Sequence, residues 1–398
     1  MLGYSDLIEA LPDSAVSKIL TEAANAHYTD VLPLAGGEPC FPTVDKIISS
    51  LNDFDEKLIT KYSPFKGHHL LLELIQKKLQ RINNIHATLN ELIVVPGGSF
   101  ALVAALMAVV NPGDEVLISN PCWEHYVSIV KLCRAKPVRF NMRYDGARYS
   151  VDMEHLKSNI NQKTKAILLN TPLNPLGSVL SRDEAQAICQ LAKLKNFWVL
   201  IDEEYETFIY DNNLHYSVRS DNEQVITLYS FSKSFALTGI RLGYIVAPEK
   251  IINLVRRYGL YTYMYPSSPS QCMAIHLLSS DYSRYLDQVT EIYQKKMSRL
   301  YNGIKDINSI ECWRPEGGVY LFPKLQVDST INAAKKLIDE FHLLCVPGYV
   351  AGEMGKYNIR LFVGVEDQHL DAAANRLKRF MKKYPAKTVC TEKVALID

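Results

Sequence analysis

Lys233 stands in the stretch "SFSKSFALTGIRLGY", residues 230–244, among serines and small residues. Ser230 and Arg241 lie in the same stretch, and a hydroxyl with a planar guanidinium suits a phosphate held by two contacts. A lysine amine can attack a carbonyl when nearby cations or burial lower its pKa. The stretch therefore predicts a reacting lysine beside an anion site, and a solvated lysine in a loop is the alternative.

A second candidate anion site is the segment "VVPGGSF", which ends an apolar run and precedes a helical pattern. Gly97 and Gly98 allow a ligand to approach the backbone closely. Ser99 opens the helix, where free N–H groups can hold an anion. The alternative is a plain strand-to-helix turn with a serine cap.

Two further polar groups follow apolar runs. Asp202 comes directly after "VLI", with Tyr205 three positions later, and a carboxylate at the end of a buried strand is costly without a strong partner. Asn174 lies between prolines in "LLNTPLNPLGS". The alternatives are that Asp202 caps the following helix and that Asn174 belongs to a proline-stiffened turn.

These candidates together ask for one ligand that carries four different groups. A phosphate would lie near Ser99, Ser230 and Arg241, and a carbonyl near Lys233. A basic ring nitrogen would face Asp202, and a phenolic oxygen would face Asn174 and Tyr205. Pyridoxal 5′-phosphate (PLP) has all four groups.

The strands and helices predicted around these residues indicate an α/β protein. From about residue 90, short β-branched runs alternate with helical stretches, and this alternation predicts a mostly parallel sheet covered by helices on both faces. Ligands of such sheets bind at the carboxyl ends of the strands, where the candidate residues fall. In residues 311–398, short strand-like runs flank helical patterns, and this arrangement predicts a separate α+β lobe. The predicted strands are "ELIVV", "DEVLIS", "KAILLN", "FWVLID", "QVITLYSF" and "RLGYIVAP".

The bulk composition is that of an ordinary enzyme. The 398 residues include 44 Lys and Arg against 43 Asp and Glu, so a net charge of +1 argues against nucleic-acid or membrane-surface partners. Acidic residues within the first twenty positions argue against a signal peptide. The eight cysteines lack CxxC spacing, which favours reduced thiols, a cytoplasmic location and no metal site.

Seven ordered motifs carry a resemblance to a known family. "SFSKSFALTGIRLG" resembles the SxSK and GxRxG pattern of class I/II aminotransferases, which are fold-type I PLP enzymes of the aspartate aminotransferase superfamily. "NPLG" and "LAGGEPCF" each differ from the family pattern at one position, with Leu176 in place of threonine and Ala35 in place of glycine. The other matching segments are "DEEY", "NPCWEHY", "YSPFKG" and "YNIRLFVG".

The resemblance implies a role for each matching residue. Lys233, Asp202 and Tyr205 are the implied catalytic residues. The implied substrate contacts are Gly37, Trp123, Asn174 and Arg360, with Arg360 on the α-carboxylate. The implied cofactor contacts are Gly98, Ser99, Phe100, Trp123, Asn174, Asp202, Tyr205, Ser230, Lys233, Arg241 and Tyr62, the last of which would reach the cofactor of a neighbouring subunit.

The resemblance also implies the reaction and the assembly. An amino acid would displace Lys233 from its imine with PLP, the freed amine would move the Cα proton, and a 2-oxo acid would leave before the steps reverse on a second oxo acid. This is a ping-pong aminotransferase of amino-acid metabolism, expected as a homodimer with shared sites. A large domain would span 50–285, and a small domain 1–49 plus 286–398.

Three questions stay open from the sequence. The same scaffold also supports C–S lyases and cyclising or eliminating enzymes, and a non-catalytic PLP-binding regulator is a remoter alternative. The donor and acceptor pair is not determined. The tyrosine-rich stretch "YGLYTYMYP", residues 258–266, either lines a substrate pocket or connects two helices at the subunit interface.

Overall fold

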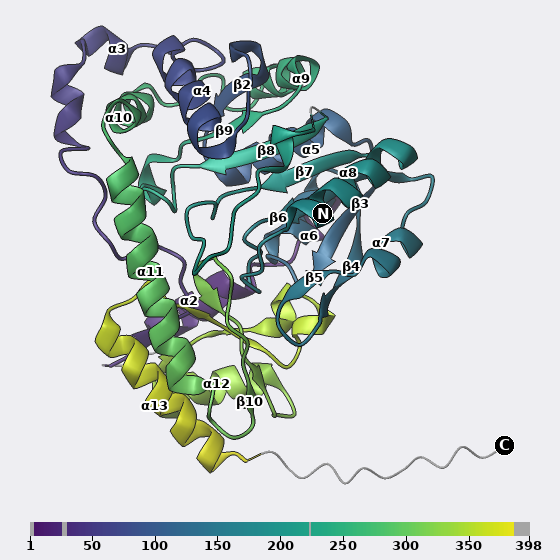
Figure 1. Ribbon diagram of the computed structural model, residues 1–398, viewed down its shortest axis with the longest axis vertical. Coiled ribbons are helices and arrows are strands. Elements are labelled where there is room, and N and C mark those ends of the chain that lie inside the picture. The colour runs from purple at the N-terminus through teal and green to yellow at the C-terminus, as the bar shows by residue number, and fades with distance from the viewer. Residues whose placement is uncertain (1–3, 26–29, 223, 386–398) are drawn as a thin grey trace.

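The computed structural model describes residues 4–25, 30–222 and 224–385. One mixed sheet of eight strands forms the centre of the larger part of the molecule (Figure 1). In spatial order its strands are β2 Leu92–Val95, β9 Gly243–Val246, β8 Val225–Ser230, β7 Trp198–Asp202, β6 Thr164–Asn170, β3 Glu115–Asn120, β4 Lys136–Tyr144 and β5 Tyr149–Val151.

The four central pairs of this sheet are parallel, and both edges are antiparallel. The five central strands run parallel to one another, so their carboxyl ends lie at the same end of the sheet. These strands are β8, β7, β6, β3 and β4. β9 returns antiparallel to β8 and then pairs with β2, and β5 forms a hairpin with β4. The α/β prediction is confirmed, and all six predicted strands are present. The β4–β5 hairpin was not predicted, although Val138, Phe140 and Met142 alternate with polar residues in the pattern of a half-buried strand.

Helices cover both faces of the sheet, as the alternation predicted. Along β2, Ile93 and Val95 pack against one helical layer, whereas Leu92 and Val94 pack against the other. The first layer consists of α5 Gly98–Val109, α6 His125–Leu132 and α9 Glu249–Leu260. The second consists of α4 His69–Asn83, α10 Ser268–Ser279, α7 Met153–Ser158 and α8 Arg182–Lys195.

The smaller part has its own apolar core, in which α11 Ser283–Ile304 packs against α13 Asp367–Lys383. Its N-terminal and C-terminal segments are joined, because β1 Leu32–Pro33 pairs parallel with β13 Leu343–Leu344. The predicted division at residues 49 and 285 stays a prediction. The remaining elements are α1 Asp6–Glu9, α2 Ala15–Asn25, α3 Glu56–Thr60, α12 Thr330–Phe341, β10 Ile310–Glu311, β11 Tyr320–Leu321, β12 Lys324–Leu325, β14 Val346–Pro347 and β15 Ile359–Phe362.

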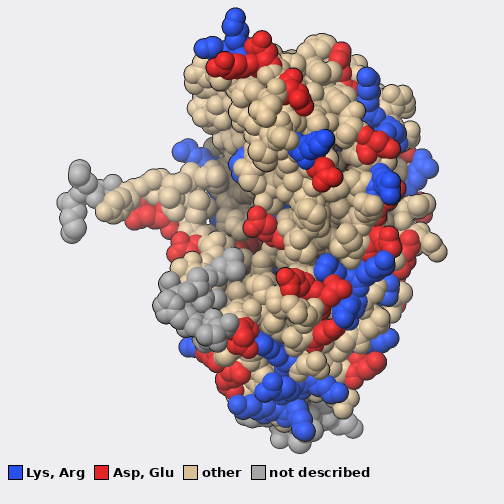
Figure 2. All heavy atoms as spheres, turned by 90° about the vertical axis from the view of Figure 1, so that its left-hand side faces the viewer, with Lys and Arg blue, Asp and Glu red and all other residues tan. Residues whose placement is uncertain are grey.

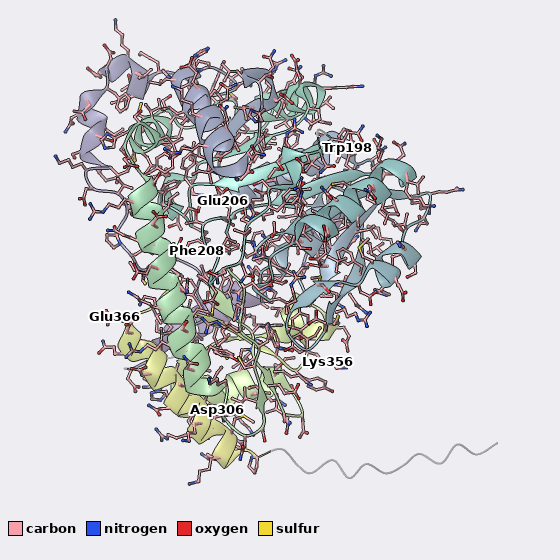
Figure 3. All side chains as sticks on the ribbon, in the orientation of Figure 1. Trp198, Glu206, Phe208, Asp306, Lys356 and Glu366 are labelled. Atoms are coloured by element: carbon pink, nitrogen blue, oxygen red, sulfur yellow. The ribbon has the colours of Figure 1, made fainter. Side chains whose placement is uncertain are left out.

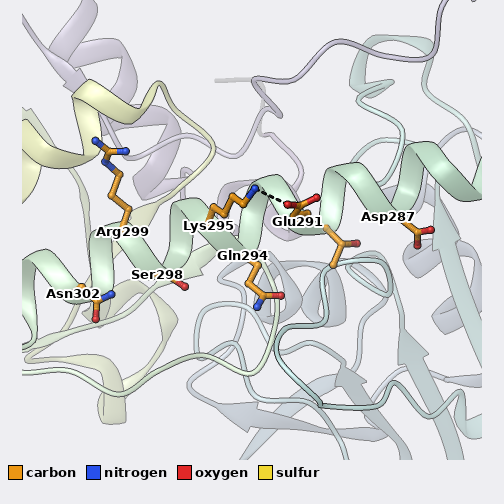
Figure 4. Close-up of a pocket in the computed structure, with 8 residues that line it drawn as sticks. Asp287, Glu291, Gln294, Lys295, Ser298, Arg299 and Asn302 are labelled. Atoms are coloured by element: carbon orange, nitrogen blue, oxygen red, sulfur yellow. Dashed lines mark hydrogen bonds and ion pairs between the residues drawn. The ribbon is translucent and has the colours of Figure 1, made fainter.

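Two features of the surface lie away from the central sheet, namely mixed charge on one face and a groove along α11. Basic and acidic side chains are interspersed over the face shown in Figure 2. A groove along α11 is lined by side chains such as Glu291 and Lys295, which point into solvent and pair with each other (Figure 4). Within the described residues, none of the helices combines the length and apolar character needed to cross a bilayer.

A buried polar cluster ties helix α4 to the sheet. We define it as Lys78, Asn83, Glu203, Glu206, His215, Ser217 and Tyr229. Glu203 accepts hydrogen bonds from Ser217 and Tyr229, each 2.8 Å long, and its Oε2 lies 3.0 Å from His215 Nε2.

The ammonium of Lys78 supplies positive charge to this cluster. Lys78 pairs with Glu206 and donates a 2.9 Å hydrogen bond to Asn83 Oδ1. Burial alone would raise the pKa of Glu203 and lower that of His215, but their mutual attraction outweighs burial and shifts both pKa values the opposite way. From Glu206 the chain continues to Phe208, whose ring packs against Tyr293 of α11 (Figure 3).

Replacing Lys78 by Met is expected to destabilise the fold, because it leaves two buried carboxylates with less compensating charge. We expect the free energy of unfolding in urea to fall by about 3–5 kcal/mol at neutral pH. Lys77 is the exposed neighbour on the same helix, and Lys77→Met is expected to change it by less than about 0.5 kcal/mol. Equal losses in the two variants would contradict the assignment of charge compensation to Lys78.

Candidate active site

A cavity of ≈ 330 Å³ lies where the carboxyl ends of β6, β7 and β8 face the N-terminal segment and β15. This size falls within the range of small-molecule sites. Ten of the residues predicted from the sequence line it: Gly37, Gly98, Ser99, Trp123, Asn174, Asp202, Tyr205, Lys233, Arg241 and Arg360. Three do not line it: Tyr62, Phe100 and Ser230.

Lys233 points into this cavity from the turn that follows β8. Its side chain is half-buried, and Nζ donates a 2.8 Å hydrogen bond to the carbonyl oxygen of Gly37. The alternative of a solvated surface lysine is therefore wrong for this position. The contact joins the turn after the large sheet to the N-terminal segment of the chain.

Asp202 ends β7 and lies in the cavity wall. Oδ2 accepts a 2.7 Å hydrogen bond from the hydroxyl of Tyr126, and Oδ1 accepts a 3.0 Å bond from the backbone N–H of Glu204. Burial, followed by the negative charge of Glu204, raises the pKa of Asp202 to about 7. The alternative that Asp202 caps a helix is not realised, because a turn follows β7; one oxygen holds this turn, and the carboxylate faces the cavity with no ion pair to the described residues. A protonated ring nitrogen is the kind of partner that this carboxylate lacks.

The segment after β2 forms a cradle open to an anion. The N-cap of α5 is Gly97, at φ 84°, and no side chain caps the helix, so the alternative of a serine cap is wrong. A Cβ on Gly97 would lie 2.7 Å from Nη2 of Arg241, which shows how closely the guanidinium approaches this backbone. Free N–H groups, a guanidinium and the nearby hydroxyl of Ser99 fit a phosphate.

Two of the predicted cofactor contacts, Ser230 and Phe100, do not line the cavity. Ser230 Oγ lies behind Gly98 and accepts a 3.1 Å hydrogen bond from the backbone N–H of Ser232, which lines the cavity in its place. The ring of Phe100 packs against Tyr258 and Tyr263, away from the cavity. Any contact from Phe100 would therefore be made by its backbone.

The remaining predicted cofactor contacts surround Asp202. The backbone N–H of Asn174 is fixed by a 2.8 Å hydrogen bond to Asn170 Oδ1. Burial and the neighbouring Tyr320 hold the pKa of Tyr205 well above its usual range, so Tyr205 keeps its proton. Trp123 packs edge-on against Tyr126, with ring centroids 5.4 Å apart.

Arg360 is a buried guanidinium whose hydrogen bonds are incomplete. It is 8% exposed, and its Nε has no hydrogen-bond partner. Its other contacts are long: Nη1 to Asn174 Oδ1 and Nη2 to the carbonyl oxygen of Ala35, both at 3.4 Å, with the ring of Tyr320 4.3 Å away. A bound carboxylate would satisfy this guanidinium.

Tyr62 and the tyrosine-rich stretch lie outside the cavity of this chain. Tyr62 is 79% exposed and stacks on Tyr265. Tyr258 in the last turn of α9 and Tyr263 in the connection to α10 pack on Phe100. In the single chain the stretch therefore connects two helices, and the alternative of a pocket lining is not realised.

Sequence reasoning missed twelve of the residues that line the cavity, and four of them bear most on its polarity. Glu204 lines it beside Gly98, and Tyr126 holds Asp202. Ser14 and His125 line its outer end. Glu204, Tyr126 and His125 stand inside or beside quoted motifs, where their charge or hydrogen-bonding capacity was a usable signal. Ser14 had none, because only the fold brings residue 14 next to residue 124.

Comparisons with known proteins agree with this geometry. A family model, aminotransferase class I and II, matches residues 29–377. An aspartate aminotransferase of Pyrococcus abyssi is 30% identical over 96% of this chain and 99% of its own. An aromatic-amino-acid aminotransferase of Thermococcus litoralis is 27% identical over 96% and 99%.

Solved structures give the same family. Aspartate aminotransferase from Thermus thermophilus with maleate superposes with a TM-score of 0.89 at 26% identity, covering 96% of this chain and all of that one. Aromatic aminotransferase from Pyrococcus horikoshii gives a TM-score of 0.85 at 29% identity, covering 94% and all of that chain. The chain belongs to the aminotransferase class I and II family, with a fold-type I fold. It is a PLP-dependent aminotransferase, and its cavity fits that cofactor.

The raised pKa of Asp202 predicts a pH-dependent penalty in the cofactor-free protein. The carboxyl ionises at pH 3.8 by its ordinary value but at about 7 when folded, so the folded state binds this proton more tightly. The stabilisation from the bound proton is therefore full below pH 4 and is lost as pH rises through 7. Between pH 5 and 7.5, we expect the free energy of unfolding in urea to fall for wild type relative to that of Asp202→Asn. An unchanged difference would contradict a raised pKa.

Proposed function

We propose that the protein transfers the amino group of an L-amino acid to a 2-oxo acid by a ping-pong mechanism. Some residues of the cavity would bind the cofactor, and others would bind the substrate and move protons. The observation that carries the proposal is one cavity holding Lys233, Asp202 and a buried, incompletely bonded Arg360. PLP, when bound, withdraws electrons from the Cα of the amino acid. The chain's own residues then bind, orient and move protons.

Cofactor binding falls to the residues along the ends of the strands. The start of α5 at Gly98 and Ser99 and the guanidinium of Arg241 would hold the phosphate. Asp202 would hold a proton on the ring nitrogen, since a buried carboxylate without a cation favours a charged partner. Asn174 and Tyr205 would hydrogen-bond the phenolic oxygen, and Trp123 would stack on the ring.

Substrate binding and proton movement fall to Arg360 and Lys233. The unpartnered Nε of Arg360 and its two long-bonded Nη atoms favour a carboxylate held by more than one contact. The amine of Lys233, once free, is the group in the cavity that can take the Cα proton and return it one position along the cofactor. Its 2.8 Å contact with the carbonyl of Gly37 keeps it at the substrate side of the cavity.

We further propose a cytoplasmic homodimer that serves amino-acid metabolism, in which Tyr62 completes the neighbouring site. Tyr62, Tyr261 and Met264 are exposed at 79%, 82% and 47%, and their segments meet where Tyr62 stacks on Tyr265. Exposed apolar side chains gathered in this way favour an interface. The large domain at 50–285 and the small domain at 1–49 plus 286–398 also stay part of this proposal.

The half-reactions test the transamination. An L-amino acid is expected to change the absorbance of the bound cofactor, and 2-oxoglutarate to restore it. Lys233→Ala is expected to slow the first step by about 10²–10⁴-fold, because it removes the proton-moving amine. Lys193→Ala, at an exposed position of α8, serves as the control and should react normally. Release of ammonia and pyruvate without any oxo-acid requirement would show elimination instead.

A mixed-subunit experiment tests the shared site. Lys233→Ala and Tyr62→Ala chains should each be impaired alone. If Tyr62 serves the neighbouring cofactor, a mixed dimer holds one site with both native residues, and mixing should restore up to about half of wild-type activity per mixed dimer. Sedimentation should give twice the mass of one chain. A monomeric active protein, or the absence of any restored activity, would argue against shared sites.

A further inference from the structure

Ser14 and His125, which line the same cavity as Arg360, give this end of it a hydrogen-bonding polarity of its own. Ser14 Oγ donates its single hydrogen to Glu124 Oε1 at 2.8 Å. The same oxygen accepts a 3.2 Å hydrogen bond from the backbone N–H of Ser17. Ser14 therefore has one remaining lone pair and no hydrogen to offer a ligand. At this point the cavity wall is an acceptor.

The charges at this end favour the same polarity. Glu124 stands behind Ser14, with its side chain only 12% exposed. Burial lowers the pKa of His125, and the nearby Arg360 lowers it further against the opposing charge of Glu124, so the imidazole is neutral near pH 7. His125 Nδ1 lies 3.8 Å from the Glu124 carboxylate and makes no hydrogen bond. No positive charge balances Glu124 here within the described part of the chain.

The cations that line the cavity are occupied elsewhere. Among the residues that the structure describes, these are Lys233, Arg241 and Arg360. Under the proposed function they serve the carbonyl, the phosphate and the α-carboxylate. The acids Asp202 and Glu204 also line the cavity, and Glu38 accepts a 2.9 Å hydrogen bond from Thr238, another lining residue. A second carboxylate on the substrate would meet an acceptor and a buried acid, without a free cation of this chain.

We propose that the amino donor carries a side chain ending in a hydrogen-bond donor, and not a carboxylate, and that Ser14, polarised by Glu124, is the acceptor that selects it. This inference rests on the proposed aminotransferase function and names the substrate class of the same site. It separates this chain from the relatives named aspartate aminotransferase, one of whose solved structures holds the dicarboxylate maleate. A site built around a hydrogen-bond acceptor discriminates strongly between substrates that differ in the matching donor.

Two isosteric pairs test the proposal on the cofactor-loaded protein. L-glutamine and L-glutamate, like L-asparagine and L-aspartate, match in size and differ in whether the side chain donates a hydrogen bond. The first half-reaction is followed by cofactor absorbance, and kcat/KM is compared within each pair. We expect the amide to exceed the acid by at least about tenfold in one pair or both, which corresponds to about 1.4 kcal/mol.

Variants of the acceptor assign the preference to its residues. Ser14→Ala should lower kcat/KM for the preferred amide by about tenfold and leave that for the acid unchanged, and Ser14→Thr, which keeps the hydroxyl, should restore much of the preference. Glu124→Gln should narrow the amide-to-acid ratio, because it removes the repelling charge. Ser49→Ala, an exposed serine far along the chain, should leave the ratio unchanged.

The outcomes separate this inference from the proposed function. If glutamate and aspartate react as fast as their amides or faster, transamination stands and the inference is overturned, and the missing cation comes from the partner subunit. If neither member of either pair changes the cofactor while amino acids without a side-chain hydrogen-bond donor do, the inference alone falls. If no amino acid changes it, the proposed function falls and takes the inference with it.

Discussion

The site depends on a carboxylate, Asp202, that the fold keeps at the end of a buried strand without a cation of its own. Its two oxygens are held by the hydroxyl of Tyr126 and by the backbone of Glu204, so its position is fixed before any ligand arrives. Burial and the neighbouring acid nevertheless raise its pKa to about 7. A positively charged ring nitrogen would relieve both effects, so cofactor binding would offset the free-energy cost of burying the ionised Asp202.

The buried polar cluster extends this constraint into the rest of the fold. Asp202, Glu204 and Tyr205 line the cavity, whereas Glu203 and Glu206, from the same short segment, belong to the cluster. The cluster connects to helix α4 through Lys78 and Asn83. A shift of α4 would therefore move the turn that holds Asp202 and Tyr205.

The sequence was sufficient for the fold class, six of the eight strands of the large sheet and ten of the residues that line the cavity. These features follow from local signals: β-branched runs, helical periodicity and polar residues directly after strands. Ser230 and Phe100 were placed less well, because whether a side chain or only its backbone faces the cavity depends on packing that the motif does not encode. In β4, Val138, Phe140 and Met142 alternate with polar residues, so the β4–β5 hairpin did have a local signal. The pairing of Ser14 with Glu124 spans 110 positions and had none.

The division of labour in the cavity has an evolutionary consequence. Under the proposed roles, cofactor chemistry would rest on strand ends and the turn after β8, whereas another part of the cavity wall comes from the start of helix α2. Substitutions in α2 leave the sheet, the anion cradle and the lysine turn untouched. Selectivity can therefore drift while catalysis is retained, as expected of a family in which relatives about 30% identical to this chain carry the names of both aspartate and aromatic-amino-acid enzymes. The N-terminal helix α2 is therefore the part of this scaffold where substitutions can change amino-acid specificity with the least effect on catalysis.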